Sequence, residues 1–141
     1  MIAFAIGCDD VGEYVIPDGV TEITNYSVYY CKSMSSLVIP DSVIRIGEGA
    51  FCDCSNLNSV TISDKVEYIG EVAFNLCHSL TSVYCKATIP PIAEDLYWKS
   101  WGAFDKNASD RKIYVPAESV EAYKSAYRWS EYASDIVGYN F

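Results

Sequence analysis

The chain has 141 residues, half of them hydrophobic, which is enough for one domain with a continuous core. Its 10 basic and 19 acidic residues give a formal net charge of −9, so a nucleic-acid backbone or an anionic membrane surface would repel it. No apolar run reaches the roughly 20 residues that cross a bilayer. We therefore expect neither a nucleic-acid partner nor insertion into a membrane.

Residues 1–14 have the features of the end of a repeat. The apolar stretch before Cys8 is short and has no basic residue, so no signal peptide is visible. The interval from Cys8 to Cys31 is also the one that recurs later in the chain, as from Cys31 to Cys54. We therefore expect a partial N-terminal repeat, preceded by further sequence in the natural protein.

Residues 15–86 repeat at a constant interval of twenty-three positions. Six apolar columns recur in strict register: Ile16, Ile39, Ile62; Val20, Val43, Val66; Ile23, Ile46, Ile69; Cys31, Cys54, Cys77; Met34, Leu57, Leu80; and Leu37, Val60, Val83. A period between about twenty and thirty residues with this apolar spacing is typical of leucine-rich repeats. One such unit cannot bury its own apolar face, so the units must stack into a solenoid.

Each repeat contains one strand and one return leg. Alternation of apolar and polar residues predicts about five strands, stacked in parallel as a narrow sheet and centred on Tyr14–Ile16, Leu37–Ile39, Val60–Ile62, Val83–Cys85 and Ile113–Val115. On the return leg, Val43, Ile46 and Ala50 are spaced by three and four residues, which predicts short helical or 3₁₀ turns. The fold class is therefore an α/β solenoid.

The last repeat, residues 87–116, contains an insertion. Cys85 and Val115 stand at equivalent core positions but are seven positions farther apart than Ile39 and Ile62, and the extra length lies between Lys86 and Gly102. Asn107 takes the place of the cysteine in this repeat. Residues 117–127 have helical spacing, and we expect residues 117–141 to form a helical cap that covers the last apolar face. The whole chain is then a single domain, 1–141.

These motifs resemble the BspA-like leucine-rich repeats of bacterial surface proteins. Their units read Leu-x-x-Val-x-Ile-Pro-x-x-Val-x-x-Ile-Gly-x-x-Ala-Phe-x-x-Cys, and the match is specific from Leu37 to Leu80. The segments Ala87–Pro91, Ile113–Pro116 and Ser119–Lys124 resemble the closing module of relatives from gut bacteria. The resemblance implies a secreted or cell-surface module that binds host or bacterial proteins, with a role in adhesion for some relatives. It implies no catalysis and no cofactor.

Four of the six cysteines form the column Cys8, Cys31, Cys54 and Cys77. Neighbours in this column lie about one strand spacing apart, so a disulfide is geometrically conceivable. We expect buried free thiols instead, with Cys85 in another core column and Cys52 as the exposed, reactive thiol. The spacing contains no C-x-x-C motif, so it predicts no metal site.

Catalytic groups are not clustered in the sequence. The single histidine, His78, stands at a variable surface position, and no Ser-His-Asp ordering or Gly-rich phosphate loop occurs. We therefore expect no catalytic residue, no metal ligand and no enzymatic activity.

The outward strand positions are the first candidate for a binding surface. They form the column Val15, Val38, Thr61, Tyr84 and Tyr114, flanked by Glu13, Ser36, Ser59, Ser82 and Lys112. Solenoids commonly bind along such a face, and its aromatic end is where a hot spot is expected. The candidate ligand-binding residues here are Val38, Thr61, Tyr84, Lys112 and Tyr114. The alternative is that the apolar residues on this face are merely tolerated.

The insertion is the second candidate. Tyr97, Trp98 and Trp101 are concentrated in the one segment that the repeat does not dictate. Aromatic faces with a few polar groups suit sugar rings or a protein groove. The alternative is that this loop folds back and seals the solenoid.

Two functions follow from this reading. The first is a recognition module that binds protein on the outward face of the sheet. The second is a structural spacer or a glycan-binding accessory domain of a larger secreted protein. The incomplete first repeat also predicts possible edge-to-edge dimerisation through the N-terminal repeat.

Overall fold

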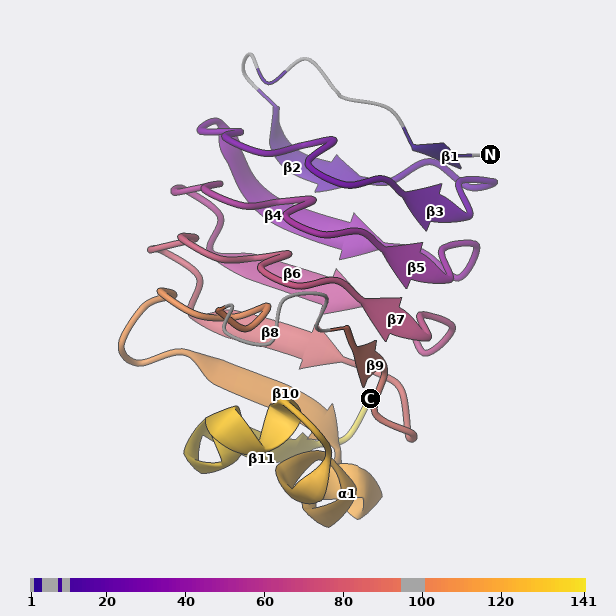
Figure 1. Ribbon diagram of the computed structural model, residues 1–141, viewed down its shortest axis with the longest axis vertical. Coiled ribbons are helices and arrows are strands. Elements are labelled where there is room, and N and C mark those ends of the chain that lie inside the picture. Colours follow the sequence, from indigo (N-terminus) through magenta and orange to yellow (C-terminus); the bar gives the residue numbers. More distant parts are fainter. Residues whose placement is uncertain (1, 4–7, 9–10, 95–100) are drawn as a thin grey trace.

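The computed structural model describes residues 2–3, 8, 11–94 and 101–141. A parallel six-stranded sheet runs the length of the solenoid (Figure 1). In chain order its strands are β2 (Gly12–Val15), β4 (Met34–Ile39), β6 (Ser59–Ile62), β8 (Ser82–Cys85), β10 (Lys112–Pro116) and β11 (Ile136–Tyr139). The first five are the strands that the repeat predicts. The sixth, β11, was expected to belong to the helical cap and instead returns to pair with β10.

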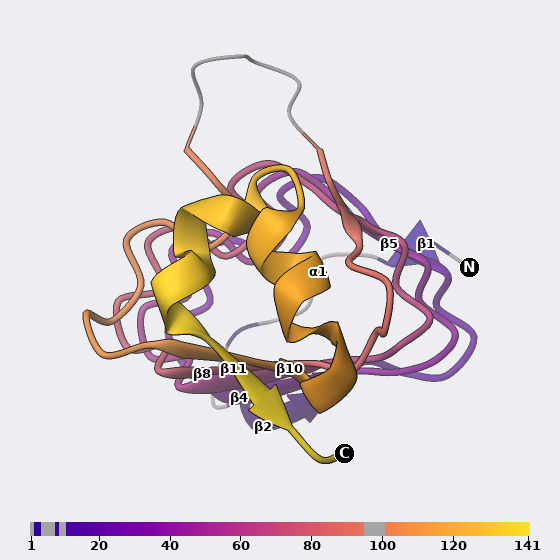
Figure 2. The ribbon, with the colours of Figure 1, turned by 90° about the horizontal axis from the view of Figure 1, so that it is seen from below.

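A second parallel sheet contains only two-residue strands. It is built from β1 (Ile2–Ala3), β3 (Glu22–Ile23), β5 (Arg45–Ile46), β7 (Tyr68–Ile69) and β9 (Ile92–Ala93), which pair in that order. Viewed along the solenoid, the wide sheet forms one side and the return legs lie across the core from it (Figure 2). Each turn of the chain thus places one long and one short strand on top of their equivalents in the previous repeat.

The core consists of the apolar columns that the sequence predicts. Ile16, Ile39, Ile62 and their counterparts in the other columns are at most a few per cent exposed. Phe51, Phe74 and Phe104 stack above one another, with ring centroids 5.3 and 5.4 Å apart and nearly parallel planes. The stack is 0–1% exposed, so each ring buries the faces of its neighbours.

The return legs are built from single tight turns. Bonds between residues i and i+3, such as that from the Cys52 amide to the Gly49 carbonyl at 3.0 Å, give the 3₁₀-type geometry that was expected. These turns do not extend into helices, because other backbone groups bond to the neighbouring repeat. The Phe51 amide donates to the Ala73 carbonyl at 2.8 Å, and the Phe74 amide donates to Ala103 at 2.8 Å. The return legs are therefore ladders between repeats.

Left-handed backbone recurs at fixed positions of the return legs. Positive φ angles occur at Tyr26, Gly49 and Val72 and again at Tyr30, Asp53, Leu76 and Lys106. At Gly49 the ring of Tyr26 lies over the backbone, and a Cβ atom there would be 2.1 Å from it. Tyr26 and Val72 adopt the same left-handed backbone at the equivalent positions, so the approach of this ring, and not the φ of +58° alone, favours glycine here.

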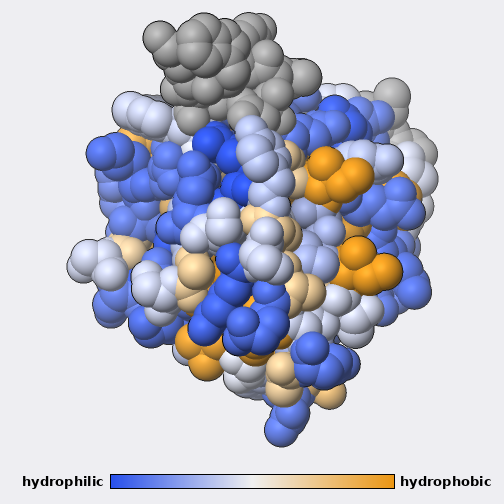
Figure 3. Space-filling view, turned by 60° about the horizontal axis from the view of Figure 1, so that its bottom comes forward, coloured by the Kyte–Doolittle hydropathy of each residue, from blue (hydrophilic) through white to orange (hydrophobic). Residues whose placement is uncertain are grey.

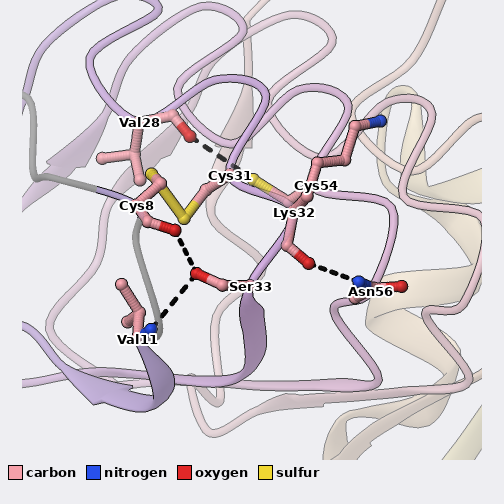
Figure 4. The surroundings of a disulfide bond; sticks show 8 residues. All are labelled: Cys8, Val11, Val28, Cys31, Lys32, Ser33, Cys54 and Asn56. Carbon is pink, nitrogen blue, oxygen red and sulfur yellow. Dashed lines mark hydrogen bonds between the residues drawn. A yellow bond between two sulfur atoms is a disulfide. The ribbon is translucent and has the colours of Figure 1, made fainter.

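The cysteine column corrects the prediction of four free thiols. Cys8 and Cys31 form a disulfide, with Cα atoms 5.2 Å apart (Figure 4). The stacking of adjacent repeats brings these Cα atoms within the range that a disulfide needs. Nearby, Ser33 donates its hydroxyl hydrogen to the Cys8 carbonyl and accepts a bond from the Val11 amide. The segment that leads into β2 is thus tied to the segment that leads into β4.

The remaining column members are buried free thiols, as predicted. Cys54 donates to the Val28 carbonyl at 3.4 Å and Cys77 donates to the Phe51 carbonyl at 3.2 Å. In the last repeat, the side-chain amide of Asn107 donates to the Phe74 carbonyl at 2.8 Å. Asn107 therefore makes the bond that the cysteine makes in the earlier repeats.

The C-terminal cap contains η1 (Ala117–Ser119), α1 (Val120–Ser125) and η2 (Trp129–Asp135). Tyr123 is fully buried, and its hydroxyl donates to the Ala87 carbonyl at 2.7 Å. Trp129 packs against Phe104 and donates its indole hydrogen to the Pro91 carbonyl at 2.8 Å. The outside of this end is mostly hydrophilic, with hydrophobic residues in separate patches (Figure 3). A polar outer surface is what a terminal cap needs.

Candidate binding face

Six outward side chains form one column across the wide sheet. The pairing registers place Val15, Val38, Thr61, Tyr84, Tyr114 and Val137 next to one another in that order. Val15, Val38 and Val137 are 60, 39 and 38% exposed, although each has a branched apolar side chain. The sequence prediction of this column is confirmed up to Tyr114, and Val137 extends it.

The C-terminal end of this column carries an aromatic cluster. We use this name for Tyr84, Tyr114, Tyr139 and Phe141. The rings of Tyr84 and Tyr114 stack with centroids 4.9 Å apart and planes 15° apart. Tyr139 lies 5.5 and 5.7 Å from these two rings at a steep angle, and Phe141 lies 4.8 Å from Tyr139. Tyr139 and Phe141 remain 44 and 51% exposed.

The stacked pair presents ring edges to a ligand. Tyr84 and Tyr114 each cover one face of the other, and their outer faces are turned along the column toward Thr61 and Val137. Ring edges and hydroxyl groups are therefore the parts directed away from the sheet. A hydroxyl both donates and accepts hydrogen bonds. This end of the sheet therefore combines apolar ring edges with polar tips.

Charge is distributed unevenly along the face. The flanking column runs from exposed Glu13 through Ser36, Ser59 and Ser82 to exposed Lys112. A hollow of about 290 Å³ lies beside Val38 and Thr61 and is also lined by Asp18, Asp41 and Lys86. Acidic groups therefore predominate in the N-terminal half of the face. Near the aromatic cluster the charges are mixed, with the basic Lys86 and Lys112 and the acidic Glu118.

Trp101, the insertion candidate that the structure describes, lies apart from this face. Tyr97 and Trp98 lie outside the described residues. Trp101 is 51% exposed, and the Lys106 ammonium lies 5.5 Å from its ring centroid. Trp101 precedes Gly102, which begins the return leg of the last repeat, and the return legs lie across the core from the wide sheet (Figure 2). Trp101 is therefore separate from the predicted sheet face.

Sequence reasoning missed two members of the aromatic cluster. Tyr139 and Phe141 come after Ile136, the buried residue that begins β11, and they belong to no repeat column. One signal could have found them. Ile136 and Gly138 alternate with Val137 and Tyr139, and such alternation is typical of a strand with one face toward the core.

No catalytic or metal centre is evident in the part of the chain that the structure describes. No group of three or more histidine, cysteine, aspartate or glutamate residues there could hold a metal ion. His78 is exposed. Within the same residues, no helix is long and apolar enough to cross a membrane.

Stacked short repeats, a parallel sheet on one side and a helical cap define a leucine-rich-repeat solenoid. A family model described as the BspA type leucine rich repeat region matches residues 3–133 in six copies. The chain therefore belongs to the family of BspA-type leucine-rich-repeat proteins.

Two solved structures are similar to this chain. A leucine rich cell surface protein from Faecalibacterium prausnitzii is 25% identical with a TM-score of 0.56, over 89% of this chain and 30% of that one. A leucine rich repeat protein from T. pallidum is 24% identical with a TM-score of 0.49, over 74% of this chain and 54% of that one. This chain thus spans about a third of the length of the first. No curated protein matches the chain significantly.

Proposed function

We propose that this chain is a non-enzymatic protein-recognition module of a bacterial protein on the cell surface or secreted from the cell. Its ligand, a host or bacterial protein, binds on the outward face of the wide sheet at the aromatic cluster. Membership of the family and the description of the F. prausnitzii neighbour as a cell surface protein support the location. The observation that carries the function is the aromatic cluster itself.

The aromatic cluster has the composition of an interface hot spot. Tyrosine is enriched among the few residues that supply most of the binding energy in protein interfaces. Tyr84, Tyr114 and Tyr139 are held in place by one another and by the sheet, so little side-chain freedom is lost when a ligand binds. Lys86 and Glu118 line a hollow beside Tyr139, and Lys112 is exposed on β10, so charged groups of both signs are available for polar contacts with a ligand there.

The ring geometry favours a protein ligand over a glycan at this cluster. Sugar rings bind by lying flat on an open aromatic face. In the stacked pair, Tyr84 and Tyr114 cover one face of each other at 4.9 Å, and their other faces are turned toward Thr61 and Val137 in the same column. Ring edges and hydroxyl tips suit the mixed apolar and polar surface of a protein.

The experiment is a binding assay against matrix proteins, mucins and glycans. The face variant carries Tyr84→Ala and Tyr114→Ala. The control carries Tyr29→Ala and Tyr30→Ala, which remove two tyrosines that are 59 and 58% exposed on a return leg. Both variants must keep the melting temperature close to that of the wild type. Binding that only the face variant loses supports the proposal.

Other outcomes point to other functions. Binding that both variants retain would direct attention to Tyr97, Trp98 and Trp101 in the insertion. Binding of glycans alone would support a glycan-binding accessory domain. A chain that binds nothing in the panel would support a structural spacer in a larger protein.

A further inference from the structure

The two outer strands of the wide sheet differ in how they are protected. A free strand edge presents a row of backbone donors and acceptors, and natural proteins guard such edges with charges, bulges or proline. At one end, β2 has a register shift between Gly12 and Glu13, and Glu13 is an exposed charge. At the other end, β11 reads Ile-Val-Gly-Tyr, with neither charge nor proline, and pairs with β10 without a break.

The hydrogen-bond pattern of the inner strands shows which backbone groups of β11 face the open side. Inward-pointing residues direct their groups to the following strand: the Ile39 carbonyl accepts from the Ser63 amide at 3.2 Å, and the Ile62 carbonyl accepts from the Lys86 amide at 3.0 Å. The Ile16 amide donates in the same direction, to the Val38 carbonyl at 3.0 Å. In this ladder, then, the inward residues of any strand bond toward the C-terminal end.

Gly138 is the inward residue in the middle of β11. It pairs with buried Val115, and a Cβ atom on Gly138 would be 3.2 Å from the Cα atom of Ala117 and 3.3 Å from Val120. By the same pattern, its amide and carbonyl point away from β10. No strand follows β11 among the described residues, so both groups lie on the open edge.

The side chains beside this edge are apolar and exposed. Val137, Tyr139 and Phe141 are 38, 44 and 51% exposed and lie at alternate positions. A hollow of about 260 Å³ adjoins the end of β11, lined by Tyr139, Asn140, Phe141, Pro116 and Glu118 among others. Figure 2 looks at this end and shows β11 in front of the other strands of the wide sheet, with the helices of the cap beside it over the core.

We propose that β11 is a docking edge for an extended peptide segment of the protein ligand, which adds a seventh strand to the sheet. The occupant follows from the geometry, because an extended backbone running along the strand can bond both the open amide and the open carbonyl of Gly138 while its side chains reach the apolar residues at alternate positions. Its apolar side chains, at every second position, lie against Val137 and Tyr139. This inference rests on the proposed function and gives it a binding mode, in which the added strand lies beside the aromatic cluster.

The probe is a phage-displayed library of random dodecapeptides, selected on the whole chain. We expect peptides with alternating apolar residues. Binding should slow hydrogen exchange at the Gly138 amide. Val137→Lys should weaken binding by about tenfold or more, since a lysine on an edge strand opposes pairing. The matched control, Val15→Lys, makes the same change at 60% exposed Val15 on β2 and should leave affinity unchanged.

Several results would overturn this inference. One is a library that yields no such peptide, and another is a selected peptide that binds Val137→Lys as tightly as the wild type with no change at Gly138. If Tyr84→Ala with Tyr114→Ala still abolishes binding of a panel protein in that case, the sheet face remains the site and only the edge is excluded. A dimer in light scattering that Val137→Lys disrupts would mean that a second copy occupies β11.

Discussion

The thiol of Cys77 donates a hydrogen bond to the carbonyl oxygen of Phe51, 26 residues earlier, at 3.2 Å. Cys54 makes the same bond to Val28, and Asn107 makes it to Phe74. From Cys54 onward, the cysteine column is therefore a line of side-chain donors, each bonded to one carbonyl of the preceding repeat. A small side chain with a donor is needed there, which is why asparagine can replace cysteine.

Cys77→Ala should lower the free energy of unfolding by about 1–3 kcal/mol, because it removes packed volume and the shorter of the two hydrogen bonds that the buried Phe51 carbonyl accepts, the other coming from the Cys54 amide at 3.4 Å. Urea unfolding followed by circular dichroism measures the change. His78→Ala, at the exposed neighbouring residue, is the control and should unfold at the wild-type urea concentration. Equal stability of the two variants would show that the thiol bond contributes nothing.

The disulfide between Cys8 and Cys31 predicts a thiol count. Protein unfolded without reductant should react at four cysteines, and reduced protein at all six. Mass spectrometry after alkylation counts the modified residues. Six reactive thiols in protein purified without reductant would contradict the disulfide.

In the folded protein, Cys52 should react first, because the other free cysteines are buried. Burial and the neighbouring Asp53 carboxylate raise the pKa of the Cys52 thiol, so its reaction should be slow near neutral pH and accelerate as the pH rises. Cys52→Ser should remove this first phase. A first phase that persists in Cys52→Ser would assign it to another cysteine.

Phe74→Ala should cost about 3–5 kcal/mol, since it opens a cavity in the middle of the phenylalanine stack. Phe74 contacts Phe51 on one side and Phe104 on the other, so the loss affects both neighbouring repeats. Thermal unfolding followed by circular dichroism is the measurement. Phe141→Ala removes the same side chain at an exposed position and should leave the melting temperature nearly unchanged.

Stability should decrease at alkaline pH. Complete burial raises the pKa of the Cys85 thiol to about 11, and burial also raises the pKa of the adjacent Tyr123 hydroxyl. In the unfolded chain a cysteine ionises near pH 8.5. The unfolded state therefore loses its proton first, and stability falls as the pH rises from about 8.5 toward 11.

Cys85→Ala tests the contribution of this thiol to the pH dependence. The variant should show a shallower decrease of unfolding free energy over the same pH range, whatever its stability at neutral pH. Urea unfolding at a series of pH values measures both slopes. Identical slopes would assign the alkaline loss to other groups, such as Tyr123.

Much of the fold could be predicted because the repeat fixes it. Ile16, Ile39 and Ile62 recur at one interval, so the strand register follows from counting alone. The two-residue strands of the second sheet, such as Arg45–Ile46, are too short to show the alternation of apolar and polar residues by which a strand is predicted. The turns of the return legs also could not be predicted in detail, because the Phe51 amide bonds to the next repeat and not along its own segment.

The candidate site was predicted in part for the same reason. Tyr84 and Tyr114 occupy a repeat column, and the sheet brings their rings together as expected. Tyr139 and Phe141 reach the same face only because β11 returns to the sheet after the cap. That return depends on how α1 and η2 pack, which no repeat encodes. The Cys8–Cys31 disulfide could not be predicted, because the spacing of these two residues is compatible with a disulfide and with two free thiols.

The same disulfide has a mechanical consequence. Tension applied to the chain at Cys8 passes through the two sulfur atoms to Cys31, because this covalent path is shorter than the backbone between them. The intervening residues, which include β2 and β3, are shielded from the load. Force therefore enters the solenoid beyond its first full repeat, just before β4, and a pull that would otherwise peel that repeat away leaves it folded.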